Sequence, residues 1–274
     1  MTDFSKYLIA TDLDGTFFDD YSQFVPRNVK ALERFRAGGG LFTVATGRVQ
    51  MNMWRRFGEF SAVLSSPAVM SNGAYLFDFT DGTAYLEEFI PAEIAEGILE
   101  LAHTKFPEVP FRVHIPNGLR VEGPMGFAGR DVKGYKPGCV TVSSGDKWRK
   151  DDWYKIVFRD WPESLAKVRA ALYERFGDNI TMASSDPTIL EIQAKGVTKA
   201  HGIDKLRRYL GNDKRIVITC GDFENDIPMH RAADIAIAPA NALDEVKAIC
   251  HHTVCHCRDG VIADVIELIE RGEL

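Results

Sequence analysis

Four short apolar runs, two near each end of the chain, are the sequence feature that most restricts the fold. Each run is five or six residues long and mostly apolar, as in strands that are covered on both faces. Helical patterns lie between the runs. This order is typical of parallel strands joined by crossover helices, so we expect both ends of the chain to contribute to one parallel sheet. The runs are Tyr7–Thr11, Leu41–Thr46, Arg215–Cys220 and Asp234–Ala238.

The helices of this sheet can be located from apolar spacing. Val29, Leu32 and Phe35 fall on one helical face, and the glycines at 38–40 end that helix. Two further helices are predicted near the C-terminus, over residues 242–250 and 261–269. Together the strands and helices predict a Rossmann-like α/β core.

The middle of the chain carries a different pattern. Asp81-Gly82 and Pro116-Asn117-Gly118 are turn sequences between strand-like runs, which indicates antiparallel hairpins. We therefore predict an inserted α+β cap with an antiparallel sheet over residues 81–190. The core would then consist of residues 1–80 and 191–274.

Composition limits the partners of the chain. A net charge of −6 over 274 residues leaves no surplus of basic side chains for a nucleic-acid backbone. No apolar run approaches the roughly 20 residues that span a bilayer, and residues 1–7 lack the basic start of a signal peptide. Five cysteines without a regular framework fit a reducing compartment. We expect a cytoplasmic protein without nucleic-acid or membrane partners; none of these features indicates an oligomeric state.

Two aspartates directly follow the first apolar run. Asp12 and Asp14 stand where an open parallel sheet binds its ligands, outside the carboxyl end of a strand. Along an extended segment both carboxylates would point to the same side, away from Leu13. An Asp-Gly turn with solvated carboxylates is the simpler alternative, and the position after a buried strand disfavours it.

The other runs end in polar residues as well. Asp222 and Asp226 follow the third run, and four aspartates at one sheet edge repel one another unless a cation lies among them. Hard carboxylate oxygens suit Mg²⁺. Thr46, Gly47 and Arg48 end the second run, and such groups at the start of a helix can bind a phosphate oxyanion.

Four motifs follow one another along the chain: Asp12-x-Asp14-Gly15-Thr16, Thr46-Gly47-Arg48, Lys199 within residues 195–199, and Gly221-Asp222-x-x-Asn225-Asp226. In this order they resemble the motifs of the haloacid dehalogenase (HAD) superfamily, with the closest similarity to its Cof-type sugar-phosphatase branch (HAD-IIB). That branch also has a large cap between the second and third motifs, so the resemblance extends over nearly the whole chain. Further matches are Ser71-Asn72-Gly73 and Asn241, whereas Ala200 and Ala240 stand where the family often has glycine.

The resemblance implies a chemical role for each motif. Asp12 would attack phosphorus and form an aspartyl-phosphate. Asp14 would protonate the leaving group and then deprotonate the water that hydrolyses the intermediate. Thr46 and Lys199 would neutralise the phosphoryl oxygens.

The resemblance also implies a metal site. Mg²⁺ would be held by Asp12, the backbone carbonyl of Asp14, and Asp222. Asp226 would fix water ligands or Lys199 from outside the coordination sphere.

Gly47, Arg48, Asn72 and Asn225 are implied substrate contacts, although Arg48 and the two asparagines can equally be capping or loop-bonding residues. The implied substrate is a small phosphorylated metabolite such as a sugar phosphate. A phosphomutase with the same nucleophile is the main alternative. A phospho-receiver is disfavoured by the insert and by Asp14, and a non-catalytic binding protein by the complete set of catalytic residues.

The segment Cys250–Cys257 contains three cysteines and three histidines among eight residues. This composition suggests zinc, but the spacing does not match the common structural pairs. The segment also falls where the last short strand of the core is expected, and alternate side chains of a strand point to opposite faces. We therefore favour a strand over a metal site for this segment, and the sequence leaves metal binding there open.

Overall fold

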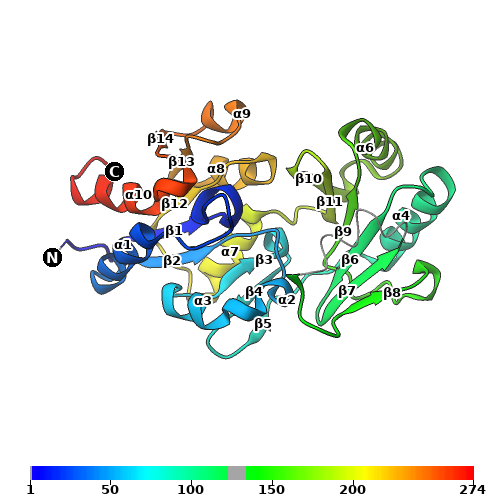
Figure 1. The fold of residues 1–274 in the computed structure, drawn as a ribbon, viewed down its shortest axis with the longest axis horizontal. Helices are drawn as coiled ribbons and strands as arrows, with labels where there is room; N and C mark the ends of the chain where they lie inside the picture. Colours follow the sequence, from blue (N-terminus) through cyan, green and yellow to red (C-terminus); the bar gives the residue numbers. More distant parts are fainter. Residues whose placement is uncertain (1, 123–133) are drawn as a thin grey trace. The chain divides into compact units, whose positions relative to one another are not determined.

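The computed structural model describes residues 2–122 and 134–274, which form two compact units (Figure 1). The chain passes from the first unit to the second after Tyr85 and returns to the first after Val197. It also enters the second unit briefly, over residues 48–55. That brief excursion has no counterpart in the sequence analysis. The first unit comprises Met1–Gly47, Arg56–Tyr85 and Thr198–Leu274, and the second comprises Arg48–Arg55 and Leu86–Val197.

The first unit contains a five-stranded parallel sheet of order β14-β13-β12-β1-β2. β1 (Tyr7–Thr11) lies between β2 (Leu41–Val44) and β12 (Ile216–Cys220), so the two ends of the chain meet in one sheet, as predicted. Every residue of β1 is buried, as expected for a strand covered on both faces. Beyond β12 follow β13 (Ile235–Pro239) and the edge strand β14 (His252–Val254).

Helices pack against this sheet. Leu8 and Ala10 of β1 share one apolar cluster with side chains of α7 (Lys199–Tyr209) and α8 (Ile227–Ala232). The predicted helix at 242–250 is shorter in the structure. Its regular part is α9 (Asp244–Lys247), because Leu243 before it is extended and the turns after it close with tighter bonds. The other helices of this unit are α1 (Pro26–Ala37), α3 (Phe57–Val63) and α10 (Val261–Glu270), and α1 and α10 pack together.

A second, antiparallel sheet completes the first unit. It has the order β3-β4-β5 and contains the hairpin predicted around Asp81-Gly82. Both hairpin strands belong to the first unit, whereas the predicted domain boundary falls between them. The strands are β3 (Ala68–Met70), β4 (Tyr75–Asp78) and β5 (Thr83–Tyr85).

The second unit is built on a six-stranded sheet of order β10-β11-β9-β6-β7-β8. The pairs are antiparallel, as predicted, except that β8 runs parallel to β7. β7 ends at Glu122 and β8 begins at Val140, a separation in sequence that parallel pairing of consecutive strands requires. The elements are α2 (Gln50–Met53), α4 (Ala92–Lys105), β6 (Phe111–Ile115), β7 (Gly118–Glu122), β8 (Val140–Val142), β9 (Lys155–Arg159), α6 (Pro162–Phe176), β10 (Ile180–Asp186) and β11 (Ile189–Ala194).

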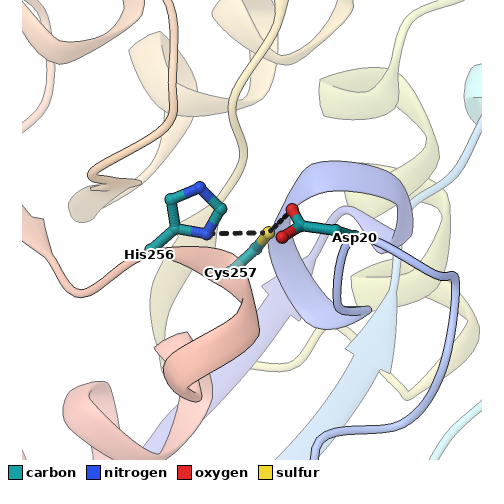
Figure 2. Close-up of side chains that lie close together, drawn as sticks. All are labelled: Asp20, His256 and Cys257. Carbon is teal, nitrogen blue, oxygen red and sulfur yellow. Dashed lines mark hydrogen bonds between the residues drawn. The ribbon is translucent and has the colours of Figure 1, made fainter.

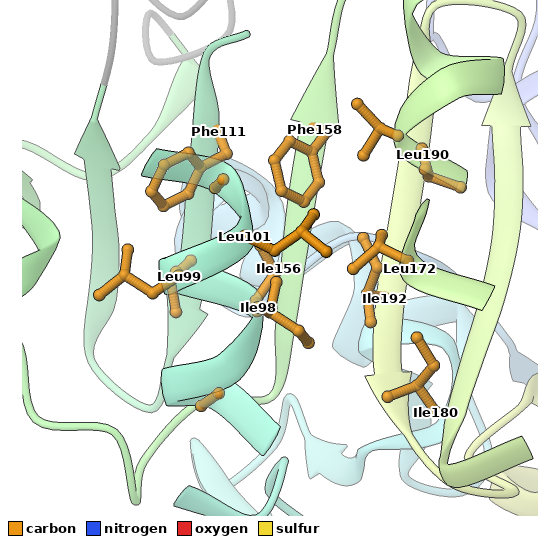
Figure 3. Packing of buried hydrophobic residues seen from close by; sticks show 14 of the residues in the cluster. Ile98, Leu99, Leu101, Phe111, Ile156, Phe158, Leu172, Ile180, Leu190 and Ile192 are labelled. Atoms are coloured by element: carbon orange, nitrogen blue, oxygen red, sulfur yellow. The ribbon is translucent and has the colours of Figure 1, made fainter. Parts of the chain in front are cut away.

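One face of this sheet forms an apolar core with α4 and α6. Leu101 of α4 and Leu172 of α6 pack with Phe158 and Ile192 of the sheet (Figure 3). Side chains on alternate positions of the same strands are buried and polar, and they include His114, Lys155, Glu191 and Gln193. In the described part of the chain, no helix has both the length and the apolar character needed to cross a bilayer.

Candidate active site

The structure brings three of the four predicted aspartates together within the first unit. Asp12 follows β1 and Asp222 follows β12, two adjacent parallel strands, and the backbone N–H of Asp12 donates to the carbonyl of Cys220 at 2.8 Å. Carboxylate oxygens of Asp12, Asp222 and Asp226 all lie within 4.8 Å of one another. This acidic group therefore occupies the sheet edge at which the sequence predicts a site.

Lys199, the first residue of α7, binds this group. Its side chain is fully buried, and the ammonium donates to Oδ1 of Asp12 at 2.5 Å and to Oδ1 of Asp226 at 2.6 Å. Oδ2 of Asp226 accepts from the backbone N–H groups of Asp222 and Phe223 at 2.9 and 3.1 Å. Both oxygens of Asp226 thus position neighbouring groups.

Asp14 lies on a tight loop, Leu13–Phe17, and its side chain is exposed. Gly15 has a φ of +79°, and a Cβ atom there would lie 2.4 Å from Oδ2 of Asp222. Glycine is therefore required both for the backbone conformation and for the close approach. Thr16 donates to Oδ1 of Asp222 at 2.7 Å, which ties this loop to the end of β12.

Burial and mutual repulsion raise the pKa values of two carboxyls in the acidic group, Asp12 and Asp222. Burial raises the pKa of Asp12 well above its usual range, an effect that Lys199 opposes and that Asp226, Asp222 and Asp14 reinforce. Burial, followed by the charge of Asp226, raises the pKa of Asp222 to about 7.

The pKa of Lys199 moves in the direction that favours its charge. Burial lowers the pKa of this ammonium, but Asp12 and Asp226 more than offset that effect and hold it above its usual value. Lys199 supplies one positive charge against the carboxylates of Asp12, Asp222 and Asp226. The negative charge that remains is what a divalent cation would neutralise.

Three of the predicted phosphate-side residues are linked by hydrogen bonds. Thr46 is buried, and its carbonyl accepts from the backbone N–H of Asn72 at 2.8 Å. The Nδ2 group of Asn225 donates to Oδ1 of Asn72 at 3.2 Å. Both asparagines therefore bond loops, one of the two roles that the sequence left open for them.

Gly47 and Arg48 belong to different units. Gly47 ends the first segment of the first unit, and Arg48 begins the short segment of the second unit. The sequence groups Arg48 with Thr46 and Gly47, whereas the division into units falls between Gly47 and Arg48.

Two buried residues near the site were missed by the sequence analysis. Lys205 donates to the carbonyls of Gly73 and Ala74 at 3.1 and 3.0 Å and fixes the turn that carries Asn72. In the sequence, the pattern that could have identified Lys205 is a lysine beside Leu206 on the apolar face of a helix.

His230 is the second missed residue. Its Nδ1 lies 2.9 Å from Oγ1 of Thr219, and its Nε2 lies 3.3 Å from the carbonyl of Gly221. Burial lowers its pKa, so the ring is held neutral while it supports the end of β12. In the sequence, the pattern that could have identified His230 is its position four residues after Asp226, on the same helical face.

The Cys250–Cys257 segment contains the predicted strand, β14, and its side chains have separate partners. Nδ1 of His251 accepts from the backbone N–H of Ala236 at 2.9 Å, whereas Cys257 contacts Asp20 and His256. The cysteine and histidine side chains of this segment therefore do not all surround one point.

A parallel sheet with buried carboxylates and a buried lysine at its carboxyl edge, interrupted by a second unit, defines an α/β enzyme with an acidic centre. The family model for haloacid dehalogenase-like hydrolases matches residues 9–266, and the chain belongs to this family. The resemblance drawn from the motifs is thereby confirmed.

Relatives of known name match nearly the whole chain. YitU of Bacillus subtilis, a 5-amino-6-(5-phospho-D-ribitylamino)uracil phosphatase, is 24% identical over 265 residues, which cover 93% of this chain and 94% of YitU. The HMP-PP phosphatase of Shigella boydii is 25% identical over 268 residues, with 93% and 97% covered. The solved structure of the HAD subclass IIB sugar phosphatase BT4131 has a TM-score of 0.81 at 21% identity, covering 96% of this chain and 98% of its own, so the two share a fold.

Proposed function

We propose that the chain is a Mg²⁺-dependent phosphatase that hydrolyses a small phosphorylated metabolite through an aspartyl-phosphate on Asp12. One observation carries this proposal: the buried ammonium of Lys199 binds both Asp12 and Asp226, and a carboxylate oxygen of Asp222 lies within 4.8 Å of theirs. A carboxylate nucleophile needs such a fixed cation to orient it and to neutralise the charge of the attacked phosphoryl group. Membership of a hydrolase family, and relatives named as phosphatases, support the reaction class.

The donor set fits Mg²⁺. The available side-chain ligands are carboxylate oxygens, which this hard cation prefers. As the family motifs imply, we assign the ion to Asp12, Asp222 and the backbone carbonyl of Asp14, and we place Asp226, whose oxygens hold Lys199 and two backbone N–H groups, outside the coordination sphere. Oδ1 of Asn225 is buried without a hydrogen-bond partner among the described residues, and a water ligand of the ion would supply a donor. When bound, Mg²⁺ would lower the pKa values of the ligating carboxyls and polarise the phosphoryl group.

The first half-reaction is a displacement at phosphorus. Lys199 holds Oδ1 of Asp12, so we assign the attack to Oδ2. The Oδ2–P bond forms as the ester P–O bond breaks, and Asp14 donates a proton to the departing alkoxide. Thr46 and Lys199 neutralise the transferred phosphoryl oxygens.

The second half-reaction returns the enzyme to its starting state. A water molecule attacks phosphorus and loses a proton to Asp14, the P–Oδ2 bond breaks, and inorganic phosphate leaves with Asp12 regenerated. Because Asp14 is exposed, solvent can reach it between the two steps.

The proposed substrate is a phosphorylated sugar or a metabolite that carries a phosphorylated sugar-like chain. The name of YitU specifies a phosphoribityl compound, and BT4131 is called a sugar phosphatase. Gly47, Arg48, Asn72 and Asn225 are the proposed substrate contacts, and the inserted region over residues 81–190 would set specificity.

Hydrolysis of p-nitrophenyl phosphate tests the proposal. We expect Mg²⁺-dependent turnover that EDTA abolishes and excess Mg²⁺ restores, and Asp12→Asn should lower it by at least about 1,000-fold. Asp244→Asn is the matched control, since that carboxylate is fully exposed in the same unit. Undiminished turnover in Asp12→Asn would contradict the nucleophile, and phosphate release that stays stoichiometric with an added sugar bisphosphate would indicate a phosphomutase.

A further inference from the structure

Outside the acidic site, three side chains of different chemistry meet in the first unit (Figure 2). They are Asp20, His256 and Cys257, and one ligand atom from each lies within 4.8 Å of the others. Sγ of Cys257 lies 3.6 Å from Oδ1 of Asp20 and 3.4 Å from Nδ1 of His256. Asp20 comes from the segment after β1, and the other two residues come from the segment after β14.

The two separations from the sulfur match edges of a tetrahedral zinc site, and the third, between Asp20 and His256, is within 4.8 Å. With Zn–S bonds of about 2.3 Å and Zn–N or Zn–O bonds of about 2.0–2.1 Å, the sulfur stands about 3.5 Å from each other ligand atom. The distances from Cys257 to Asp20 and to His256 lie just above and just below that value. An ion could therefore replace the thiol proton with little movement of the three side chains.

Hydrogen bonds outside the group orient its ligand atoms. The backbone N–H of Arg258 donates to Nδ1 of His256 at 3.4 Å, so this nitrogen acts as an acceptor and carries no proton. The guanidinium of Arg258 lies 3.4 Å from Oδ2 of Asp20, and Oδ1 is the oxygen that faces the thiol. The contact of Arg258 with the far oxygen of Asp20 is of the kind that supports a metal ligand, whereas a cation bound to Nδ1 of His256 would replace the long hydrogen bond from the Arg258 backbone.

The position of Cys257 is also fixed. Its side chain is buried, and its backbone N–H donates to Oδ1 of Asn241 at 2.9 Å. Asp20 is exposed and His256 is half-buried, so an ion can reach the buried sulfur from solvent. Three protein ligands leave one of four tetrahedral positions for water or another small ligand.

We propose that Asp20, His256 and Cys257 form a binding site for a zinc-class divalent cation, distinct from the acidic site. A thiolate and an imidazole select borderline-soft ions such as Zn²⁺, whereas Asp12, Asp222 and Asp226 offer only oxygen. This proposal changes the interpretation of the Cys250–Cys257 segment. Its last two residues become ligands because Asp20, which no local spacing rule connects to them, completes the set.

The new site is connected to the catalytic loop through one side chain. Nδ2 of Asn241 donates to the carbonyl of Gly15 at 2.7 Å, while Oδ1 of the same residue accepts from Cys257. Gly15 is adjacent to Asp14. A cation on Cys257 would therefore restrain the loop that carries Asp14, although binding itself is independent of the proposed phosphatase reaction.

Co²⁺ is the probe for this site, because its absorption spectrum reports both tetrahedral geometry and thiolate ligation. Reduced protein is titrated with Co²⁺ in excess Mg²⁺, which keeps the oxygen-only site occupied. We expect a thiolate-to-cobalt charge-transfer band that saturates near one equivalent and disappears when Zn²⁺ is added. Absence of this band in the wild-type protein would overturn the proposal.

Variants assign the ligands. Cys257→Ser should abolish the band and weaken Zn²⁺ binding by more than about 100-fold, since loss of a ligand exceeds the 10–100-fold effect of losing an outer contact. Asp20→Asn, at an exposed position, keeps the shape of the side chain and should weaken Zn²⁺ binding with little change in the thermal midpoint. Cys255→Ser and Asp222→Asn are the controls and should keep the band. A band that persists in Cys257→Ser, or that is lost equally in Cys255→Ser, would contradict the assignment.

Discussion

Lys199 and Asp12 are 187 positions apart in the sequence, yet Nζ of the lysine lies 2.5 Å from Oδ1 of the aspartate. The same ammonium binds Asp226 at 2.6 Å, so one buried cation joins the segments after β1 and β12. The site is therefore held together by a charge on a third element, α7.

Replacing Lys199 by Met keeps much of its volume and removes its charge. Asp12 and Asp226 are then left without their cation, and we expect turnover to fall at least about 100-fold. The free energy of unfolding should fall by about 3–5 kcal/mol, as when one partner of a buried ion pair is deleted. Urea unfolding followed by far-UV circular dichroism measures the second effect. Lys247→Met, at a partly exposed lysine of the same unit, should change neither quantity, and wild-type turnover in Lys199→Met would exclude the proposed role.

Two glycines with positive φ, Gly73 and Gly82, allow the cost of backbone strain to be measured separately from the cost of a steric clash. A Cβ atom at Gly73, where φ is +98°, would lie 2.1 Å from the carbonyl oxygen of Thr198, whereas at Gly82, where φ is +73°, it meets nothing within 4 Å. We expect Gly82→Ala to cost about 1 kcal/mol and to leave turnover unchanged. Gly73→Ala should cost about 2–4 kcal/mol and reduce turnover, because Thr198 directly precedes Lys199. Equal stability and activity of the two variants would show that the Thr198 contact has no influence.

The second unit can be followed separately by its fluorescence, because all four tryptophans of the chain, Trp54, Trp148, Trp153 and Trp161, belong to it. Lys155 and Glu191 form a buried ion pair in this unit. We expect Lys155→Met to lower the urea stability reported by fluorescence by about 3–5 kcal/mol, since Glu191 loses the charge of this ion pair. Lys155→Met combined with Glu191→Leu should recover most of that loss. A double variant as unstable as the sum of the two single variants would mean that the two residues act independently.

Acid should destabilise the second unit through His114. Burial, followed by the charges of Lys155 and Arg112, lowers the pKa of this histidine well below its usual value of 6.5. As the pH falls below about 6.5 the unfolded chain therefore binds more protons than the folded one, and stability is lost at up to about 1.4 kcal/mol per pH unit. His114→Asn removes this titration, so the stability difference between pH 7 and pH 5.5 should shrink by roughly 1 kcal/mol. His252→Asn, at an exposed position, is the control, and an unchanged pH dependence in His114→Asn would refute the mechanism.

The positions of Asp12 and Asp222 could be predicted from sequence because their signal is local. Each follows a continuous apolar run, and parallel strands bring their carboxyl ends to one edge. Lys199 carries no such signal in its own neighbourhood, and its place in the site was implied by the family motifs alone. Its partners are set by the register of α7 against the sheet, which apolar periodicity does not encode.

Other features depend on contacts between distant segments. The assignment of Arg48 to the second unit and the meeting of Asp20 with Cys257 follow from how remote parts of the chain pack together. The parallel pairing of β8 with β7 is likewise not encoded in the composition of either strand. Local propensity cannot specify such features, because it is the same for every arrangement of the segments.

The position of β1 between β2 and β12 has a consequence for synthesis on the ribosome. Its partner β12, over residues 216–220, is made about 200 residues later, a delay of about 10–40 s at ordinary translation rates. During this time an apolar strand has an unpaired edge, which is a risk for aggregation. The six strands of the other sheet are all complete once Ala194 has emerged. We therefore expect the nascent chain to need a chaperone at its N-terminal strand until the last third of the protein has been made.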